Sequence, residues 1–181
     1  MSKREDKRAE VIERLARHFL SEGLGDSGLR KLAEVAGTSD RMLLYYFDNK
    51  DELLAAVLAH IAGGMNAALS SLFGEQPRAP ALMLQQLWRV ACQPDFADHL
   101  NLWLEMSSRA GRGDVMAIAV VTQISASWTQ WLASLLDVPQ DQQLALANLL
   151  LAVVDGQLVM FPDDLSRGEA AINLLIEKLS H

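Results

Sequence analysis

Residues 27 to 53 read SGLRKLAEVAGTSDRMLLYYFDNKDEL, which predicts two short helices around a glycine turn and the start of a third. In the first helix the apolar residues recur at three- and four-residue spacing, so one face is buried, and Ser27 is a suitable N-cap. Gly37 tolerates the left-handed backbone that a tight C-terminal turn needs, and Thr38 or Ser39 can cap the next helix. The sequence therefore predicts two helices that meet across a tight corner.

The second helix, roughly residues 39 to 46, is predicted to bury Leu43 and Phe47 and to expose its remaining side chains. Exposed polar and aromatic side chains on the second helix of such a pair can reach bases and phosphates, which is the layout of a recognition helix. The side chains predicted to make these contacts are Asp40, Arg41, Met42, Tyr45 and Tyr46.

The third helix of this stretch begins at a predicted capping box. Asn49 is followed three residues later by Glu52, and Lys50 lies at the helix start, where a phosphate could be gripped. Lys50 and the two capping serines, Ser27 and Ser39, complete the predicted DNA-contacting set. Taken singly, each of these residues fits an ordinary structural role equally well, but their combination arises by chance in few helical proteins.

In order and spacing, residues 29 to 53 resemble the DNA-binding segment of the tetracycline-repressor (TetR) family of one-component transcriptional regulators. Two positions depart from the family pattern: Leu44 replaces the tyrosine that most members carry, and Asp40 takes a position that is commonly lysine or a small polar residue. The positions that match without gaps are Leu32, Ala33, Ala36, Gly37, Ser39, Leu43, Tyr45, Tyr46, Phe47, Asn49, Lys50 and Leu53.

Composition indicates a soluble, cytoplasmic globular protein. The chain has 181 residues, 50% of them hydrophobic, and its charged N-terminus is not followed by a signal-peptide core. We find no apolar run of transmembrane length without charges or breakers, so no membrane partner is expected. The single cysteine, Cys92, cannot form an intrachain disulfide, and the four histidines are scattered, so neither a metal site nor a cofactor is predicted.

Charge is unevenly distributed along the chain. The net charge of −7 argues weakly against a nucleic-acid binder, but residues 1 to 60 contribute only −1 (ten Lys/Arg, eleven Asp/Glu) and residues 61 to 181 contribute −6 (six and twelve). The first seventeen residues hold six basic groups and four acids. This local excess is compatible with an arm that lies along DNA or with a solvated tail.

Helical periodicity continues through the rest of the chain, and no alternating strand pattern competes with it. The predicted fold class is all-α: a three-helix domain with a helix-turn-helix over residues 1–48, then a helical bundle over 49–181 whose first helix, about 49–73, connects the two. Helices are expected at about 5–22, 29–36, 39–46, 49–73, 80–92, 95–110, 114–137, 140–160 and 166–180.

The helices between residues 80 and 135 are rich in Trp and Met, and the resemblance implies an effector cavity among them. Large amphipathic side chains suit an adaptable apolar pocket, although such residues are more often plain core. Glu105 and Asp155 are the acids most expected to be drawn inside, and for Asp155 we favour a structural kink with Gly156 over a ligand role. The predicted pocket residues are Met83, Trp88, Trp103, Met106, Trp128, Trp131 and Asp155.

The last two helices are broadly apolar, which indicates cover on both flanks. The resemblance implies that they form a four-helix dimer interface, while a central place in a monomeric core is the alternative. The residues predicted for the interface are Leu151, Leu158, Leu175 and Leu179.

These features predict a homodimeric regulator, most simply a repressor, which binds double-stranded operator DNA and is released by an unknown small, largely apolar effector. No phosphate-binding loop, nucleophile elbow or paired catalytic carboxylates are found, so an enzyme is not predicted. The alternative is a helical module that binds a ligand or a protein without DNA, which would leave residues 27 to 53 without a role.

Overall fold

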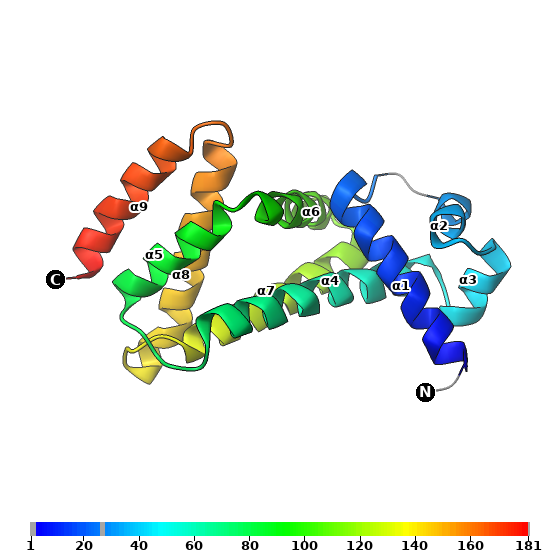
Figure 1. Cartoon of the computed structure of the whole chain (residues 1–181), viewed down its shortest axis with the longest axis horizontal. Coiled ribbons are helices and arrows are strands. Elements are labelled where there is room, and N and C mark those ends of the chain that lie inside the picture. Colours follow the sequence, from blue (N-terminus) through cyan, green and yellow to red (C-terminus); the bar gives the residue numbers. More distant parts are fainter. Residues whose placement is uncertain (1–2, 26–27, 181) are drawn as a thin grey trace. The chain divides into compact units, whose positions relative to one another are not determined.

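The computed structural model describes residues 3–25 and 28–180 and is all-α within them, as predicted (Figure 1). Each helix begins and ends within a few residues of its predicted bounds. The helices are α1 (Lys3–Glu22), α2 (Leu29–Ala36), α3 (Asp40–Tyr46), α4 (Lys50–Phe73), α5 (Pro80–Ala91), α6 (Pro94–Gly111), α7 (Val115–Ser134), α8 (Gln140–Met160) and α9 (Leu165–Leu179).

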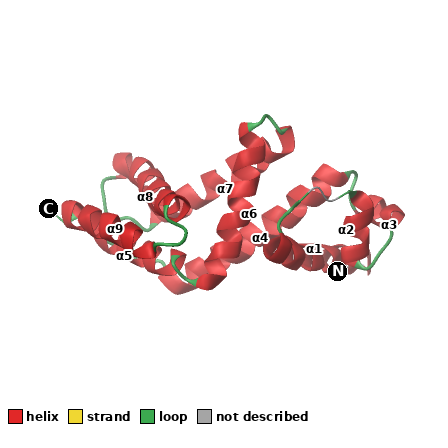
Figure 2. Ribbon diagram, turned by 90° about the horizontal axis from the view of Figure 1, so that it is seen from above, coloured by secondary structure: helices red, strands yellow, loops and turns green. Residues whose placement is uncertain are grey.

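The chain divides into two compact units. Unit 1 comprises residues 1–69 and 101–124, and its core joins one face of α1 to α2, α3 and the first turns of α4. Figure 2 shows α1, α2 and α3 together near the N-terminus. Leu15, Leu32, Leu43 and Leu53 are fully buried there, one from each of these helices. The predicted apolar spacing of all four helices therefore serves one shared core.

Unit 2 comprises residues 70–100 and 125–181, where α5, α8 and α9 pack on one another. The α5–α9 contact depends on a glycine: a Cβ atom at Gly168 would lie 2.6 Å from Cη2 of Trp88, so the indole ring occupies the space of the missing side chain. Before α5, Arg78 exchanges backbone hydrogen bonds with Leu135 and Asp137, which fastens the α4–α5 connection to the end of α7.

The two compact units begin and end at other residues than the two predicted domains, 1–48 and 49–181. The boundaries between the units fall within helices, after Leu69 in α4, before Asn101 in α6 and after Ile124 in α7, whereas the sequence predicts a single boundary between residues 48 and 49. The predicted domain limits stay a prediction, because a compact unit is defined by contacts and can take in segments that lie far apart in the sequence.

Among the described residues, α4 and α8 are long and apolar enough to cross a membrane by length and composition. The sequence prediction that no apolar run reaches transmembrane length did not anticipate these two helices. Core helices of soluble proteins pass the same test, so the observation is weak evidence for a membrane.

Candidate nucleic-acid interface

The corner between α2 and α3 has the predicted geometry. Gly37 adopts φ 67° and ψ 37°, and the amides of Gly37 and Thr38 donate to the carbonyls of Glu34 and Ala33 at 3.1 and 2.9 Å. Ser39 caps α3, because its Oγ accepts a hydrogen bond from the Met42 amide at 3.3 Å. Only Gly37, Thr38 and Ser39 separate the two helices, which fixes the angle at which α3 leaves the corner.

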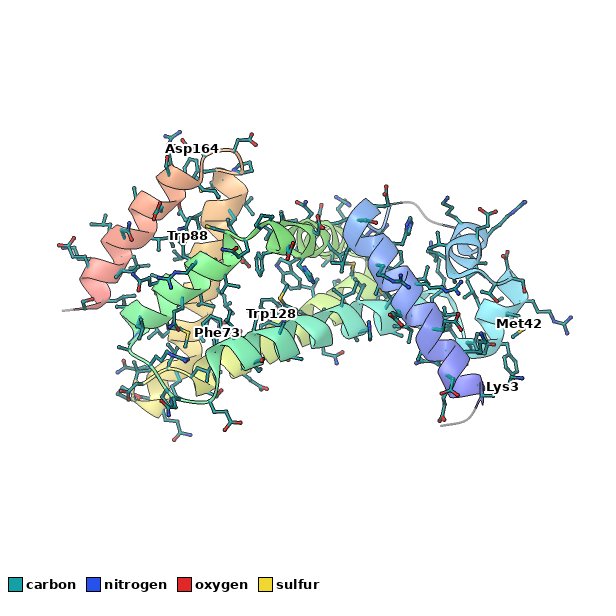
Figure 3. The ribbon with its side chains drawn as sticks, viewed as in Figure 1. Lys3, Met42, Phe73, Trp88, Trp128 and Asp164 are labelled. Atoms are coloured by element: carbon teal, nitrogen blue, oxygen red, sulfur yellow. The ribbon has the colours of Figure 1, made fainter. Side chains whose placement is uncertain are left out.

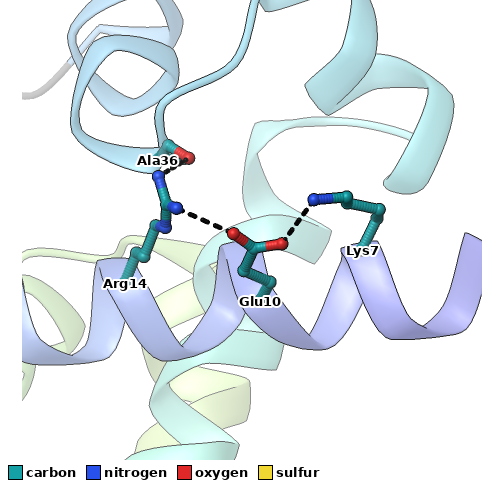
Figure 4. Close-up of polar contacts among 4 residues, drawn as sticks. All are labelled: Lys7, Glu10, Arg14 and Ala36. Atoms are coloured by element: carbon teal, nitrogen blue, oxygen red, sulfur yellow. Dashed lines mark hydrogen bonds and ion pairs between the residues drawn. The ribbon is translucent and has the colours of Figure 1, made fainter.

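An arginine that the sequence motifs did not single out holds this corner from α1 (Figure 4). Arg14 donates from Nη1 to the Ala36 carbonyl at 3.2 Å and from Nη2 to Glu10 at 2.7 Å, and Lys7 donates to the same carboxylate at 2.7 Å. The hydrogen bond from Lys7, with the charges of Lys7 and Arg14, lowers the pKa of Glu10 below its ordinary value. A cation at the last carbonyl of α2 also complements the helix dipole.

This network has a recognisable signal in the sequence. Lys7, Glu10 and Arg14 are spaced three and four residues apart, so they lie on one face of α1. The spacing predicts an ion-pair row, but only the fold shows that the row ends on α2.

The recognition helix α3 exposes most of the predicted side chains. Leu43 alone is fully buried in it, while Asp40 and Arg41 are exposed, Met42 is 36% exposed and Tyr45 is 57% exposed. Figure 3 shows Met42 on this helix.

Tyr46 differs from the other predicted contacts. It is half-buried, packs against the core of unit 1 and meets the Tyr45 ring edge-on at a centroid distance of 5.4 Å. Its main contribution in this structure is packing. Ser27, also predicted to contact DNA, lies outside the described residues, and Gly28 stands at the N-cap of α2.

The basic N-terminal residues lie against the end of α3. Arg4 donates to the Tyr45 carbonyl at 3.1 Å, and its guanidinium lies 5.0 Å from the centre of the Tyr45 ring. One turn later, Arg8 lies 4.6 Å from the centre of the Phe47 ring and pairs with Glu52 at 3.1 Å. The first turns of α1 therefore bring two arginines to the C-terminal end of α3.

The predicted capping box at the start of α4 is present. The Glu52 amide donates to Asn49 Oδ1 at 2.9 Å, and Glu52 Oε2 accepts from the Asp48 amide at 2.5 Å. Lys50 is the first residue of α4 and is half-buried. The amides of a helix N-terminus favour an anion, and phosphate binding by Lys50 stays a prediction.

The predicted pocket residues divide between the units. Trp103 and Met106 belong to unit 1, where Met106 is part of the core, and the other five belong to unit 2. Trp88 packs on Gly168, and Trp131 meets Phe73 edge-on with ring centres 5.5 Å apart. Met83 is completely buried. These contacts are those of core residues, and their role in a pocket stays a prediction.

Unit 2 also buries polar atoms that have no hydrogen-bond partner in the described structure. They are the indole nitrogen of Trp128, the amide oxygens of Gln86 and Gln157, and Nη1 of Arg78. Burial raises the pKa of Asp155 from 3.8 to about 6. Unpartnered buried polar groups are costly, so Trp128, Gln86 and Gln157 are groups that a bound molecule could stabilise, together with the desolvated carboxyl of Asp155.

Glu105, the other acid expected inside, has a different role. Its Oε2 accepts a hydrogen bond from the Leu24 amide at 2.9 Å, and its Oε1 lies 3.9 Å from Nε of Arg109. Arg109 in turn donates to the Gly25 carbonyl at 2.8 Å. Both side chains of α6 thus hold the turn that follows α1, all within unit 1.

The apolar helices α8 and α9 each keep an exposed apolar face, but not the face of every predicted residue. Leu158 is buried within unit 2, whereas Leu151, Leu175 and Leu179 are half-buried. The reason is helical phase, because Leu158 shares its face with the other buried residues of α8. The large apolar residues that remain exposed on the two helices are Leu144, Leu149, Val159, Met160, Leu165 and Leu174.

Comparison with known protein families finds a match for the segment that contains the α2–α3 corner. The model of the bacterial regulatory proteins of the tetR family matches residues 11–57, which span α1 from Val11, α2, α3 and the start of α4. Over these residues the chain is similar to regulatory proteins of the tetR family.

Relatives of known type agree with this assignment. The HTH-type transcriptional repressor NicS of Pseudomonas putida is 31% identical over 65 residues, which are 36% of this chain and 31% of NicS. The chain thus matches about a third of the length of this curated relative.

Solved structures of transcriptional regulators share the fold over nearly the whole chain. A TetR-family regulator from Cytophaga hutchinsonii superposes with a TM-score of 0.78, 16% identity and coverage of 99% of this chain and 96% of that one. FadR from Bacillus subtilis, in complex with stearoyl-CoA, gives a TM-score of 0.63 with 17% identity, covering 94% and 96%. At these identities the likeness shows the fold alone.

Proposed function

We propose that the protein is a ligand-responsive transcriptional regulator that binds duplex operator DNA through α3 and acts as a repressor in the cytoplasm, without catalytic activity. The observation that carries this proposal is the α2–α3 corner. Gly37 and Ser39 terminate and restart the helices within three residues, and α3 exposes Arg41 and Tyr45 from a rigid core. A helix exposed in this way suits entry into a major groove.

Two copies of the chain would supply two recognition helices for the half-sites of a near-palindromic operator. The exposed apolar face of α8 and α9 supports a homodimer, since Leu149 and Leu174 are at least half exposed in one copy. Leu174→Glu should therefore yield a 19.9 kDa species in light scattering at micromolar concentration. Leu82→Glu, the same change at an exposed leucine of α5, should stay dimeric. A dimer for both variants would contradict this interface.

The effector we propose is a small, largely apolar molecule that binds within unit 2. The support is the set of buried polar atoms without partners, on Gln86, Trp128 and Gln157, together with the desolvated carboxylate of Asp155. A carboxylate in this state favours a ligand that donates hydrogen bonds or carries positive charge. FadR, a relative in fold, is solved with stearoyl-CoA, which combines a long apolar chain with polar groups.

Selection of duplexes tests DNA binding directly. The purified protein should recover a related set of sequences from a random-sequence library, and binding of the recovered duplex should weaken steeply with salt. Arg112→Ala is a suitable control variant, because Arg112 is exposed and contacts only the neighbouring turn of its own segment. If no sequence is enriched and binding shows no salt dependence, the proposed function is wrong.

A further inference from the structure

The recognition helix carries a large apolar side chain that the DNA-contacting set did not include. Leu44 is 50% exposed, although the helix has only seven residues and already exposes Met42 and Tyr45. Single exposed hydrophobic residues are normal on protein surfaces. Leu44 and Tyr45 are neighbours on the exposed side of this helix and form a small apolar surface that water solvates poorly.

Helical phase puts Leu44 next to the predicted base-reading arginine. Arg41, Leu44 and Tyr45 stand at positions i, i+3 and i+4, so they share one face of α3. Leu43, about 100° away from Leu44, points into the core and is fully buried. The half of α3 that faces away from the core therefore presents a cation, a leucine and a tyrosine side by side.

The side chain of Leu44 can contribute only apolar contact. It has no atom that donates or accepts a hydrogen bond, so it cannot hold a phosphate or a polar base edge. In the major groove the one apolar group at a base edge is the C5-methyl of thymine. Any other base at this place would lose water from a polar edge without a compensating contact.

The surroundings of Leu44 favour nucleic acid over a protein partner as the occupant. On the exposed side of α3, Arg41 lies three residues before Leu44 and the acid Asp40 four residues before it, and Lys50 starts the helix that follows. Arg4 reaches the end of α3 through its hydrogen bond to the Tyr45 carbonyl. Leu44 thus lies on a short helix that has a cation near each end, an arrangement that suits a groove floor between two phosphate backbones.

We propose that Leu44 is a specificity-determining residue that recognises thymine by its methyl group, at one position of each operator half-site. This inference rests on the proposed function, because it names part of the DNA sequence that the regulator would bind.

Replacement of thymine by deoxyuridine tests the proposal, since the change removes one methyl group and leaves base pairing intact. The probe is the duplex recovered by the wild-type protein from a random-sequence library, with each thymine replaced in turn in both half-sites. Burial of one methyl is worth about fourfold in affinity, so the pair of substitutions at the Leu44 position should weaken binding about sixteenfold.

Variants of Leu44 assign the effect to this side chain. Leu44→Ala should bind the thymine and uracil duplexes with similar affinity at that position, and Leu44→Gln should lose the same methyl dependence. Leu82→Ala, at an exposed leucine of α5, should keep the full wild-type discrimination. Because Leu44 is half exposed, both of its variants are expected to fold, and circular dichroism checks that they do.

The outcomes separate this inference from the proposed function. Absence of any enriched duplex would reject the proposed function itself. An enriched duplex whose binding is insensitive to every thymine-to-uracil change would reject only the role of Leu44. The same conclusion would follow if Leu44→Ala kept the methyl dependence at every position where the wild-type protein shows it.

Discussion

At the corner between α2 and α3, the cost of replacing Gly37 should depend on a second residue, Arg14. In Gly37→Ala, the left-handed backbone at this position would cost about 1–2 kcal/mol of unfolding free energy. The new Cβ would also occupy the place of Nη1 of Arg14. The guanidinium must then leave the Ala36 carbonyl, which adds about 1 kcal/mol, the low end for a charged hydrogen bond because Arg14 is partly exposed. The expected total is about 2–3 kcal/mol.

A double-mutant cycle isolates the part that belongs to Arg14. Arg14→Ala alone should cost about 1 kcal/mol, through the lost hydrogen bond and the lost cation at the end of α2. The variant with both substitutions should be no less stable than Gly37→Ala, because the arginine is already displaced there. Gly74→Ala is a matched control: Gly74 has φ 66°, and an added Cβ would meet no atom within 4 Å, so its cost should be independent of Arg14.

Amide hydrogen exchange measures these free energies at the corner itself. The Thr38 amide donates to the Ala33 carbonyl at 2.9 Å, so its protection reports opening of the turn even if the two units unfold separately. If the losses of unfolding free energy in Gly37→Ala and Arg14→Ala simply add in the double variant, the proposed clash between the new Cβ and the Arg14 side chain is refuted. The same variants should bind the selected duplex more weakly, since α3 is positioned by this turn.

Three further predictions concern packing, titration and DNA contacts. Gly168→Ala should destabilise the protein by about 1–3 kcal/mol in urea unfolding because the Cβ would overlap an indole ring, whereas Gly63→Ala, with open space around it, should stabilise by about 0.5–1 kcal/mol. Burial raises the pKa of Asp155 from 3.8 to about 6, so the native state binds this proton more tightly than the unfolded chain does. The unfolding free energy of the wild type should therefore fall by about 3 kcal/mol as the pH rises from about 4 to 7. Asp155→Asn should show no such fall when unfolding is measured at a series of pH values. Arg41→Ala should cost about 1–3 kcal/mol of binding and relax preference at one base pair per half-site, while Lys50→Ala should weaken all sequences alike and lower the salt slope by about one per subunit in titrations of the selected duplex.

Local signals in the sequence were sufficient to predict the secondary structure. Gly37, Ser39 and the pair Asn49 and Glu52 are predicted from their neighbours alone, and the structure has each in its predicted conformation or hydrogen bond. Such signals work because a helix terminus leaves backbone groups that must be satisfied within a few residues. The requirement is local, so the sequence contains the information.

Which face of an apolar helix is buried could not be predicted in the same way. Residues 144 to 161 are apolar on nearly every side, so periodicity does not distinguish the face that packs within the subunit from the face that remains exposed. The sequence therefore places Leu158 in a dimer interface, although its own subunit buries it, and leaves out Leu149, which is exposed. Only the neighbours α5 and α9 decide between the two faces.

Contacts between distant segments were equally invisible in the sequence, and Glu105 shows the consequence for mechanism. As an acid in a helix rich in apolar residues, it is expected from the sequence to be drawn inside, but the amide that it binds, in the turn after α1, is 81 residues away in the sequence. Gly23 in that turn has φ 75°, and a Cβ there would lie 3.1 Å from the Glu105 carboxylate, so the turn accommodates this contact only with glycine. Together with Arg109, which donates to the Gly25 carbonyl, the carboxylate connects α6 to the turn at the end of α1.

The sequence suggested α4 as the element that connects DNA reading to the rest of the chain. A displacement of α6 would also reach α1, and through Arg14 the corner of the helix-turn-helix, without passing through α4.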